Sequence, residues 1–148
     1  IRRCQPHMVL APWRDDLHPD HAGAGRLLER AWYLTGVGKY AGDLAPSRPR
    51  QIGFYMCHTD FTPSAIIDVS SVWQQRTEAV QAYASQFHQE GVAGPKTKIA
   101  SPDFLAAVEG RARHFGLMIG AKYGEPISWQ FPVAMTSVDG LFSKGKLA

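Results

Sequence analysis

The chain has 148 residues, of which 45% are apolar and 20% are charged, and its formal net charge is +3. This length and composition suit one compact globular domain and exclude an intrinsically disordered protein. The basic residues are scattered along the chain and are not clustered with aromatic side chains on one element, which argues against a nucleic-acid-binding protein.

The two cysteines, Cys4 and Cys57, lie outside any CxxC pair. Their spacing argues against a disulfide framework and against a structural zinc knuckle. No apolar run approaches the about 20 residues of a membrane span, and no secretory signal is visible. We therefore expect a cytoplasmic protein without a membrane partner. The chain starts with Ile1-Arg2-Arg3, and we expect it to begin in the middle of a larger fold.

The first predicted elements are a strand, a loop and a helix. An apolar run at residues 8–11 predicts a buried strand that Pro12 ends. Residues 13–17 then form a loop at the carboxyl end of this strand, where α/β proteins commonly build their sites. Pro19 suits a first helical turn, and apolar residues recur from there with helical spacing until Gly36.

Strands and helices continue to alternate in the rest of the chain, which predicts an α/β protein with a mainly parallel sheet flanked by helices. The expected elements are strands at 51–57 and 65–69, a helix from Ser70 or Ser71 to Gly91, a helix that Ser101 caps and Gly120 or Gly124 ends, and an edge strand at 127–131. Three buried strands are few for such a sheet. We therefore expect residues 1–148 to be a single domain that forms the C-terminal part of a larger one.

Two histidines at the predicted helix start, His18 and His21, carry the clearest chemical signal. They are three residues apart, so both side chains can project into one space. Imidazole is the commonest metal ligand, and the nearby Asp15, Asp16 and Asp20 supply carboxylates that can bind a metal or fix a histidine tautomer. The pattern favours a metal site over its alternative, a solvated helix cap with charged neighbours.

Further candidates follow the first and second predicted strands. His58 and Asp60 come after the second strand and are candidates to contact substrate or to support a ligand, the alternative being a loop pair bonded to backbone. Trp13 lies in the site loop and is a candidate to face the substrate. Cys57 has no neighbour that orients it as a nucleophile, so we expect a buried, inert thiol.

An ordered series of motifs extends along nearly all 148 residues. It comprises Leu10-Ala11-Pro12, His18-Pro19-Asp20-His21, Gly38-Lys39-Tyr40, Pro46-Ser47-Arg48-Pro49, Phe54-Tyr55-Met56, His58-Thr59, Asp68-Val69-Ser70, Tyr83-Ala84-Ser85-Gln86-Phe87, Ser101-Pro102-Asp103-Phe104, Arg111 to Gly116 and Ile119 to Tyr123. The series resembles the LmbE-like deacetylases of the GlcNAc-PI de-N-acetylase superfamily. It is most similar to the branch that acts on N-acetylglucosaminyl-malate in bacillithiol biosynthesis. This resemblance implies a Rossmann-like fold.

The resemblance also implies an activity, the hydrolytic N-deacetylation of an N-acetylglucosamine conjugate by a bound zinc or another divalent metal. GlcNAc-malate is the expected substrate. His21 matches a family metal ligand. His18 would stabilise the oxyanion and protonate the leaving amine, and Asp20 would orient His18. Arg48 matches a family arginine near the substrate, and Trp13 and His58 are the other expected substrate contacts.

The sequence also departs from the family. An AHPDD-type motif, which supplies the family with a His ligand, an Asp ligand and the general base, does not occur in it. Leu17 stands where relatives often carry Arg, and Phe104 stands where some carry Tyr. We expect the absent ligands to come from outside this chain, and the isolated chain to have negligible deacetylase activity.

Homo-oligomers are common in the family, so a homo-oligomer is expected here. Two other hypotheses stay open. The chain is a non-catalytic oligomerisation or binding module, or it holds a different metal through His18, His21, His58 and Asp60.

Overall fold

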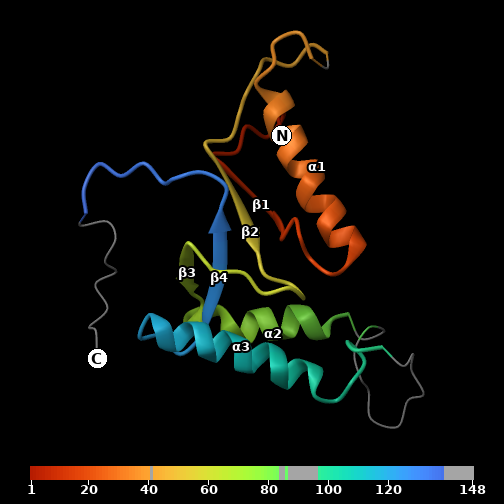
Figure 1. Cartoon of the computed structure of the whole chain (residues 1–148), viewed down its shortest axis with the longest axis vertical. Helices are drawn as coiled ribbons and strands as arrows, with labels where there is room; N and C mark the ends of the chain where they lie inside the picture. The colour runs from red at the N-terminus through yellow and green to blue at the C-terminus, as the bar shows by residue number, and fades with distance from the viewer. Residues whose placement is uncertain (41, 84–85, 87–96, 139–148) are drawn as a thin grey trace. The chain divides into compact units, whose positions relative to one another are not determined.

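The computed structural model describes residues 1–40, 42–83, 86 and 97–138, and its elements are drawn in Figure 1. In chain order they are β1 (Met8–Pro12), α1 (Pro19–Thr35), β2 (Gln51–Tyr55), β3 (Ala65–Asp68), the short 3₁₀ helix η1 (Ser70–Val72), α2 (Trp73–Gln81), α3 (Phe104–Met118) and β4 (Gly124–Trp129). None of the described helices has the length and apolar character needed to cross a bilayer.

The four strands form one sheet in the order β1-β2-β4-β3. β1 and β2 are parallel, whereas β2 and β4 are antiparallel. The hydrogen bonds Ser64 N to Ile127 O and Val69 N to Tyr123 O flank β3 and run in opposite chain directions, so β3 is antiparallel to β4 as well. The α/β class is therefore confirmed.

Two details of the predicted sheet are not confirmed. The sheet is not mainly parallel. β1 and β2, which the helical crossover α1 joins, are parallel, but β4 is antiparallel to both of its neighbours, β2 and β3. The last strand is not at an edge either, since β4 pairs with β2 and β3. Its burial explains this position: Ile127 is 2% exposed, and a strand buried to this degree gains from neighbours on both sides.

The chain divides into two compact units. The first contains the described residues up to Ala65 together with those from Pro126 onward. Its core is formed by buried Ala11 of β1 with Ile52 and Phe54 of β2, and Trp32 of α1 packs against it. The prediction that residues 1–148 are a single domain, the C-terminal portion of a larger one, stays a prediction.

Helix α1 begins and ends where the sequence predicts. His18 is its N-cap, Pro19 occupies the first turn and Gly36 is the C-cap. The C-terminal end is closed by buried Arg2, which the sequence did not single out. Its guanidinium uses all five N–H donors on backbone carbonyls, those of Leu34, Thr35, Val37, Tyr40 and Leu44.

The second unit comprises Ile66–Glu125. Its core contains Val69, Ala112 and Tyr123, and Trp73 stacks on Tyr123 with ring centroids 4.2 Å apart. Trp73 is thus partly buried and packs against this core.

The helix boundaries in this unit differ from the prediction at the start of α3 and are described only in part at the end of α2. Ser101 does not cap α3. The N-cap is Asp103, and a turn in which Phe104 N bonds Ser101 O precedes the helix. Helix α2 ends at Gln81, and the predicted end at Gly91 lies outside the described residues.

Candidate functional site

Three predicted site histidines lie together in the first unit. β1 and β2 are parallel neighbours, so the segments that follow them begin at the same edge of the sheet. His18 and His21 come from the start of α1, and His58 comes from the segment after β2. The ring centroids are 4.8 Å apart for His18 and His21, 5.2 Å for His21 and His58, and 6.3 Å for His18 and His58. The structure thus forms a histidine cluster from residues 40 positions apart in the sequence.

His18 has a defined role at the start of α1. Its backbone is extended, and its Nδ1 accepts a hydrogen bond from the backbone N–H of Asp20 at 3.2 Å. A nitrogen that accepts a hydrogen bond carries no proton, so the neutral ring holds its proton on Nε2. The contact with Asp20 therefore involves its backbone. The predicted orienting role of the Asp20 carboxylate stays a prediction.

Asp16 is the buried centre of the loop before α1. Its side chain is 0% exposed, and Oδ1 lies 3.0 Å from both the His18 backbone N and the His21 Nδ1. Oδ2 accepts from the backbone N–H groups of His58 at 2.8 Å and Thr59 at 3.0 Å. Burial raises the pKa of the carboxyl, but these hydrogen bonds lower it more, to about 2. Asp16 is therefore an ionised acceptor at neutral pH.

Composition and spacing do not show which of Asp15, Asp16 and Asp20 supports the site. In the structure the three differ in burial and in hydrogen-bonding partners. Asp15 is exposed and forms ion pairs with Arg14 and Arg26. Asp20 is exposed in the first turn of α1. A local signal for Asp16 exists, because an Asp two residues before a helix N-cap can accept from the N-cap backbone N–H.

Cys57 differs from the buried, inert thiol that its sequence neighbours predict. β2 ends at Tyr55, so Cys57 lies beyond the strand, and its side chain is half-buried rather than enclosed in a core. Asp16, His21 and Cys57 each offer one ligand atom, and these atoms lie within 4.8 Å of one another. Carboxylate, imidazole and thiol are donors that zinc accepts, so the residues present fit a zinc-like ion.

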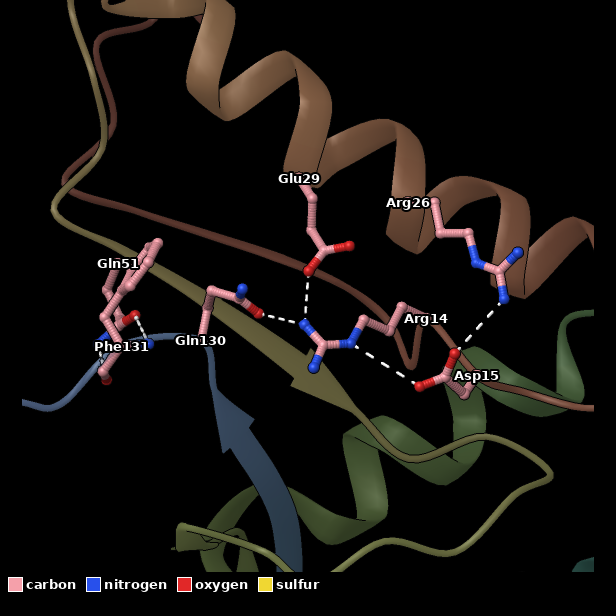
Figure 2. A network of polar contacts seen from close by, with 7 residues as sticks. All are labelled: Arg14, Asp15, Arg26, Glu29, Gln51, Gln130 and Phe131. Atoms are coloured by element: carbon pink, nitrogen blue, oxygen red, sulfur yellow. Dashed lines mark hydrogen bonds and ion pairs between the residues drawn. The ribbon is translucent and has the colours of Figure 1, made fainter.

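Arg14 fixes the loop between β1 and His18, as Figure 2 shows. Its guanidinium bonds Glu29 of α1 and Gln130 just after β4, and its Nε lies 3.8 Å from Asp15. Gln51 makes a similar link, because its side-chain amide donates to Phe131 O and accepts from Phe131 N. The Arg14 contacts tie the site loop to α1 and to the residue after β4, and the Gln51 contacts tie the start of β2 to the same segment after β4.

The remaining predicted site residues lie in other surroundings. Trp13 packs against Phe54 and Phe61, with ring centroids 5.6 and 4.8 Å away. Arg48 lies at the opposite end of the 17-residue α1, about 25 Å along the helix from His18. There it donates to Tyr33 O at 2.7 Å and covers the Trp32 ring. The structure does not bring Arg48 to the histidine cluster, and the substrate roles of Trp13, Arg48 and His58 stay predictions.

Comparison with known proteins finds a curated relative of stated activity. The chain is 30% identical over 135 residues to diacetylchitobiose deacetylase of Thermococcus kodakarensis, covering 86% of this chain and 46% of that protein. It thus spans about half the length of the curated relative it matches. No family model matches the chain.

Solved structures share the fold over most of the chain. The conserved protein TT1542 from Thermus thermophilus is 32% identical with a TM-score of 0.78, over 91% of this chain and 56% of that one. N,N'-diacetylchitobiose deacetylase from Pyrococcus horikoshii, complexed with its inhibitor MPG, is 21% identical with a TM-score of 0.69, over 87% and 47%. The hydratase GalB from Pseudomonas putida is 19% identical with a TM-score of 0.70, over 92% and 57%.

The last two likenesses, below 25% identity, show the fold alone. A hydratase and a deacetylase share it, so the fold does not decide the chemistry. The sequence likeness to diacetylchitobiose deacetylase supports the superfamily resemblance that the motifs of this chain indicate.

Proposed function

We propose that this chain contributes to the active site of a metal-dependent N-deacetylase that acts on an N-acetylated amino sugar. The observation that carries the proposal is the cluster of His18, His21 and His58 around buried Asp16. The likeness to diacetylchitobiose deacetylase supports the reaction class, hydrolysis of an N-acetyl amide.

In this proposal His21 holds the metal ion, and Cys57 lies close enough to offer a second donor. When bound, a zinc-like ion polarises the amide carbonyl and lowers the pKa of bound water. Tight zinc binding usually needs three protein ligands. The AHPDD-type motif that would complete the set does not occur in these 148 residues. The proposal therefore assigns the chain a share of the site and gives the isolated chain weak zinc affinity and negligible deacetylation.

His18 is proposed as the group that donates to the oxyanion and then protonates the leaving amine. Its Nδ1 is engaged by the Asp20 backbone N–H, so Nε2–H is the free donor of the neutral ring. A positioned Nε2–H is the arrangement that oxyanion stabilisation requires. The proposed role of the Asp20 carboxylate is to stabilise the charged form of His18 during proton transfer.

For the substrate we propose a GlcNAc conjugate, and among such conjugates we propose GlcNAc-malate of bacillithiol biosynthesis. The support is the ordered series of motifs, including Gly38-Lys39-Tyr40 and Pro46-Ser47-Arg48-Pro49. Trp13 and His58 are the proposed substrate contacts. His58 belongs to the cluster, and the half-buried Trp13 lies in the loop that leads to it. Arg48 lies about 25 Å along α1 from His18, farther than one GlcNAc-malate molecule spans, so its predicted substrate contact is not part of this proposal. A cytoplasmic homo-oligomer completes the proposal.

Acetate release tests this function. The protein is purified from its own source, so that any linked or associated chain stays with it, and is assayed on GlcNAc-malate, GlcNAc-inositol and N,N'-diacetylchitobiose. We expect acetate release that a chelator stops and zinc restores, with GlcNAc-malate as the best substrate. Release that persists in the chelator would contradict the metal dependence. Release from none of the three would contradict the proposed substrate class and favour the binding-module alternative.

A further inference from the structure

Asp16 has four hydrogen-bonding partners, two on each carboxylate oxygen. We infer that Asp16 is a positioning residue that holds His21 with its proton on Nδ1 and its Nε2 lone pair free for a ligand. It also clamps the segment after β2 to the start of α1. The role in metal binding rests on the proposed function, whereas the proton position on His21 does not.

The hydrogen-bond donors around Asp16 set its charge. Three of its four partners are the backbone N–H groups of His18, His58 and Thr59, which can only donate. Both oxygens therefore accept from fixed N–H donors, and such donors stabilise the charged form of a carboxyl over its neutral form. A buried carboxylate is stable only when it is hydrogen-bonded, and Asp16 meets this condition with three backbone donors.

The tautomer of His21 follows from the charge of Asp16. Its Nδ1 lies 3.0 Å from Asp16 Oδ1, which as part of a carboxylate can only accept. Nδ1 must therefore carry the hydrogen, and in the neutral ring Nε2 is left with its lone pair. A carboxylate behind one ring nitrogen and a metal on the other is the usual arrangement of ligand histidines.

Asp16 itself is not the metal ligand in this inference. Its ligand atoms lie near those of His21 and Cys57, so proximity alone would permit it. However, a cation on either oxygen would displace N–H groups that have this carboxylate as their acceptor. Leaving a buried amide unpaired is unfavourable. The geometry therefore assigns metal binding to His21 and orientation to Asp16.

Asp16 also joins two segments of the chain. It accepts from His58 and Thr59, and Thr59 Oγ1 in turn accepts from Leu17 N at 2.8 Å. These reciprocal bonds fix the loop before α1 against the segment after β2. The result is the parallel stack of His21 on His58, whose ring planes differ by 3°.

Long-range ¹H–¹⁵N NMR of the ¹⁵N-labelled chain tests the inference without metal or substrate, with the His21 signals assigned from the His21→Gln variant. We expect neutral His21 to carry its proton on Nδ1. In Asp16→Asn the side-chain NH₂ cannot accept from the backbone N–H groups that it faces, and the carboxylate charge is gone. We therefore expect neutral His21 to lose its preference for a proton on Nδ1. Asp15→Asn removes the same charge one residue away, from an exposed side chain, and should leave the His21 proton on Nδ1. The His114 signals, which come from the second unit, serve as an internal reference.

Zinc titration of the same variants adds the metal-binding step. We expect Asp16→Asn to weaken zinc binding by about 10–100-fold per folded molecule, whereas Asp15→Asn changes it by less than about threefold. A wild-type His21 protonated on Nε2, or an Asp16→Asn variant with unchanged His21 signals, would overturn the positioning role. If Asp16→Asn does not fold, the wild-type spectrum alone decides. If His21 carries its proton on Nδ1 but the chain binds no zinc at all, the proposed function fails and the positioning role stands.

Discussion

Two glycines of α1 provide a matched test of how this helix is held against the site loop. A Cβ added to buried Gly25 would lie 2.7 Å from Pro12 O, 2.8 Å from Arg14 Cα and 3.0 Å from Arg14 N. All three are backbone atoms that no rotamer change can move. A Cβ added to exposed Gly23 would meet nothing within 4 Å.

The magnitudes follow from two opposing effects. Replacing a helical Gly by Ala gains about 1 kcal/mol from helix propensity, which is the expected result for Gly23→Ala. At Gly25 the same gain is opposed by overpacking, which costs about 3 kcal/mol when the contacts are rigid. The net expectation for Gly25→Ala is a loss of about 2 kcal/mol. The two variants should then differ by about 3 kcal/mol in free energy of unfolding.

Urea denaturation of the wild type and both variants, followed by far-UV circular dichroism, measures this difference. Zinc titration adds a functional measure, because Arg14 lies two residues before Asp16 and a shift of its backbone should reach the clamp. We expect Gly25→Ala to weaken zinc binding and Gly23→Ala to leave it unchanged. A Gly25→Ala variant as stable as Gly23→Ala would refute the close approach of α1 to the site loop.

Three further predictions concern stability. Arg2→Ala should lower the free energy of unfolding by about 3 kcal/mol in urea, because five carbonyls lose a charged donor, and Arg2→Lys, with three donors, should recover only part of it. Folding lowers the pKa of Asp16 from 3.8 to about 2, so the ionised carboxylate stabilises the fold above pH 4. The free energy of unfolding, measured from pH 5 to pH 2, should therefore fall by about 2 kcal/mol in the wild type. The Asp16→Asn variant should lack this fall. Arg48→Ala should cost about 1 kcal/mol through the lost bond to Tyr33 O and the contact with Trp32, with zinc affinity unchanged in a titration.

Much of the first unit could be predicted from local sequence patterns. Pro19 and Gly36 marked the ends of α1, and the apolar run at 8–11 marked β1, because these signals act within a few residues. The histidine pair His18 and His21 was also local, since three residues separate them on one helix. The alternation of strands and helices indicated the α/β class.

The features that were missed depend on contacts far apart in the sequence. The antiparallel position of β4 depends on pairing between residues more than 70 positions apart. The spacing of apolar residues within one segment does not indicate which distant strand it pairs with. The donors on Asp16 include His58 and Thr59, 42 and 43 positions away, so its rank among the three aspartates could not be read locally. Arg48 was assigned by resemblance, and its contacts at the end of α1 appeared only with the structure.

The central claim is that His21 holds a catalytic metal, and acetate release by two matched histidine variants tests it most directly. His21→Ala and His114→Ala are each introduced into the protein and purified from its own source, and their acetate release from GlcNAc-malate is compared at saturating zinc. His114 lies on α3 of the second unit and is exposed. We predict that His21→Ala abolishes zinc-dependent release and that His114→Ala retains it. Equal release by both variants would contradict the account.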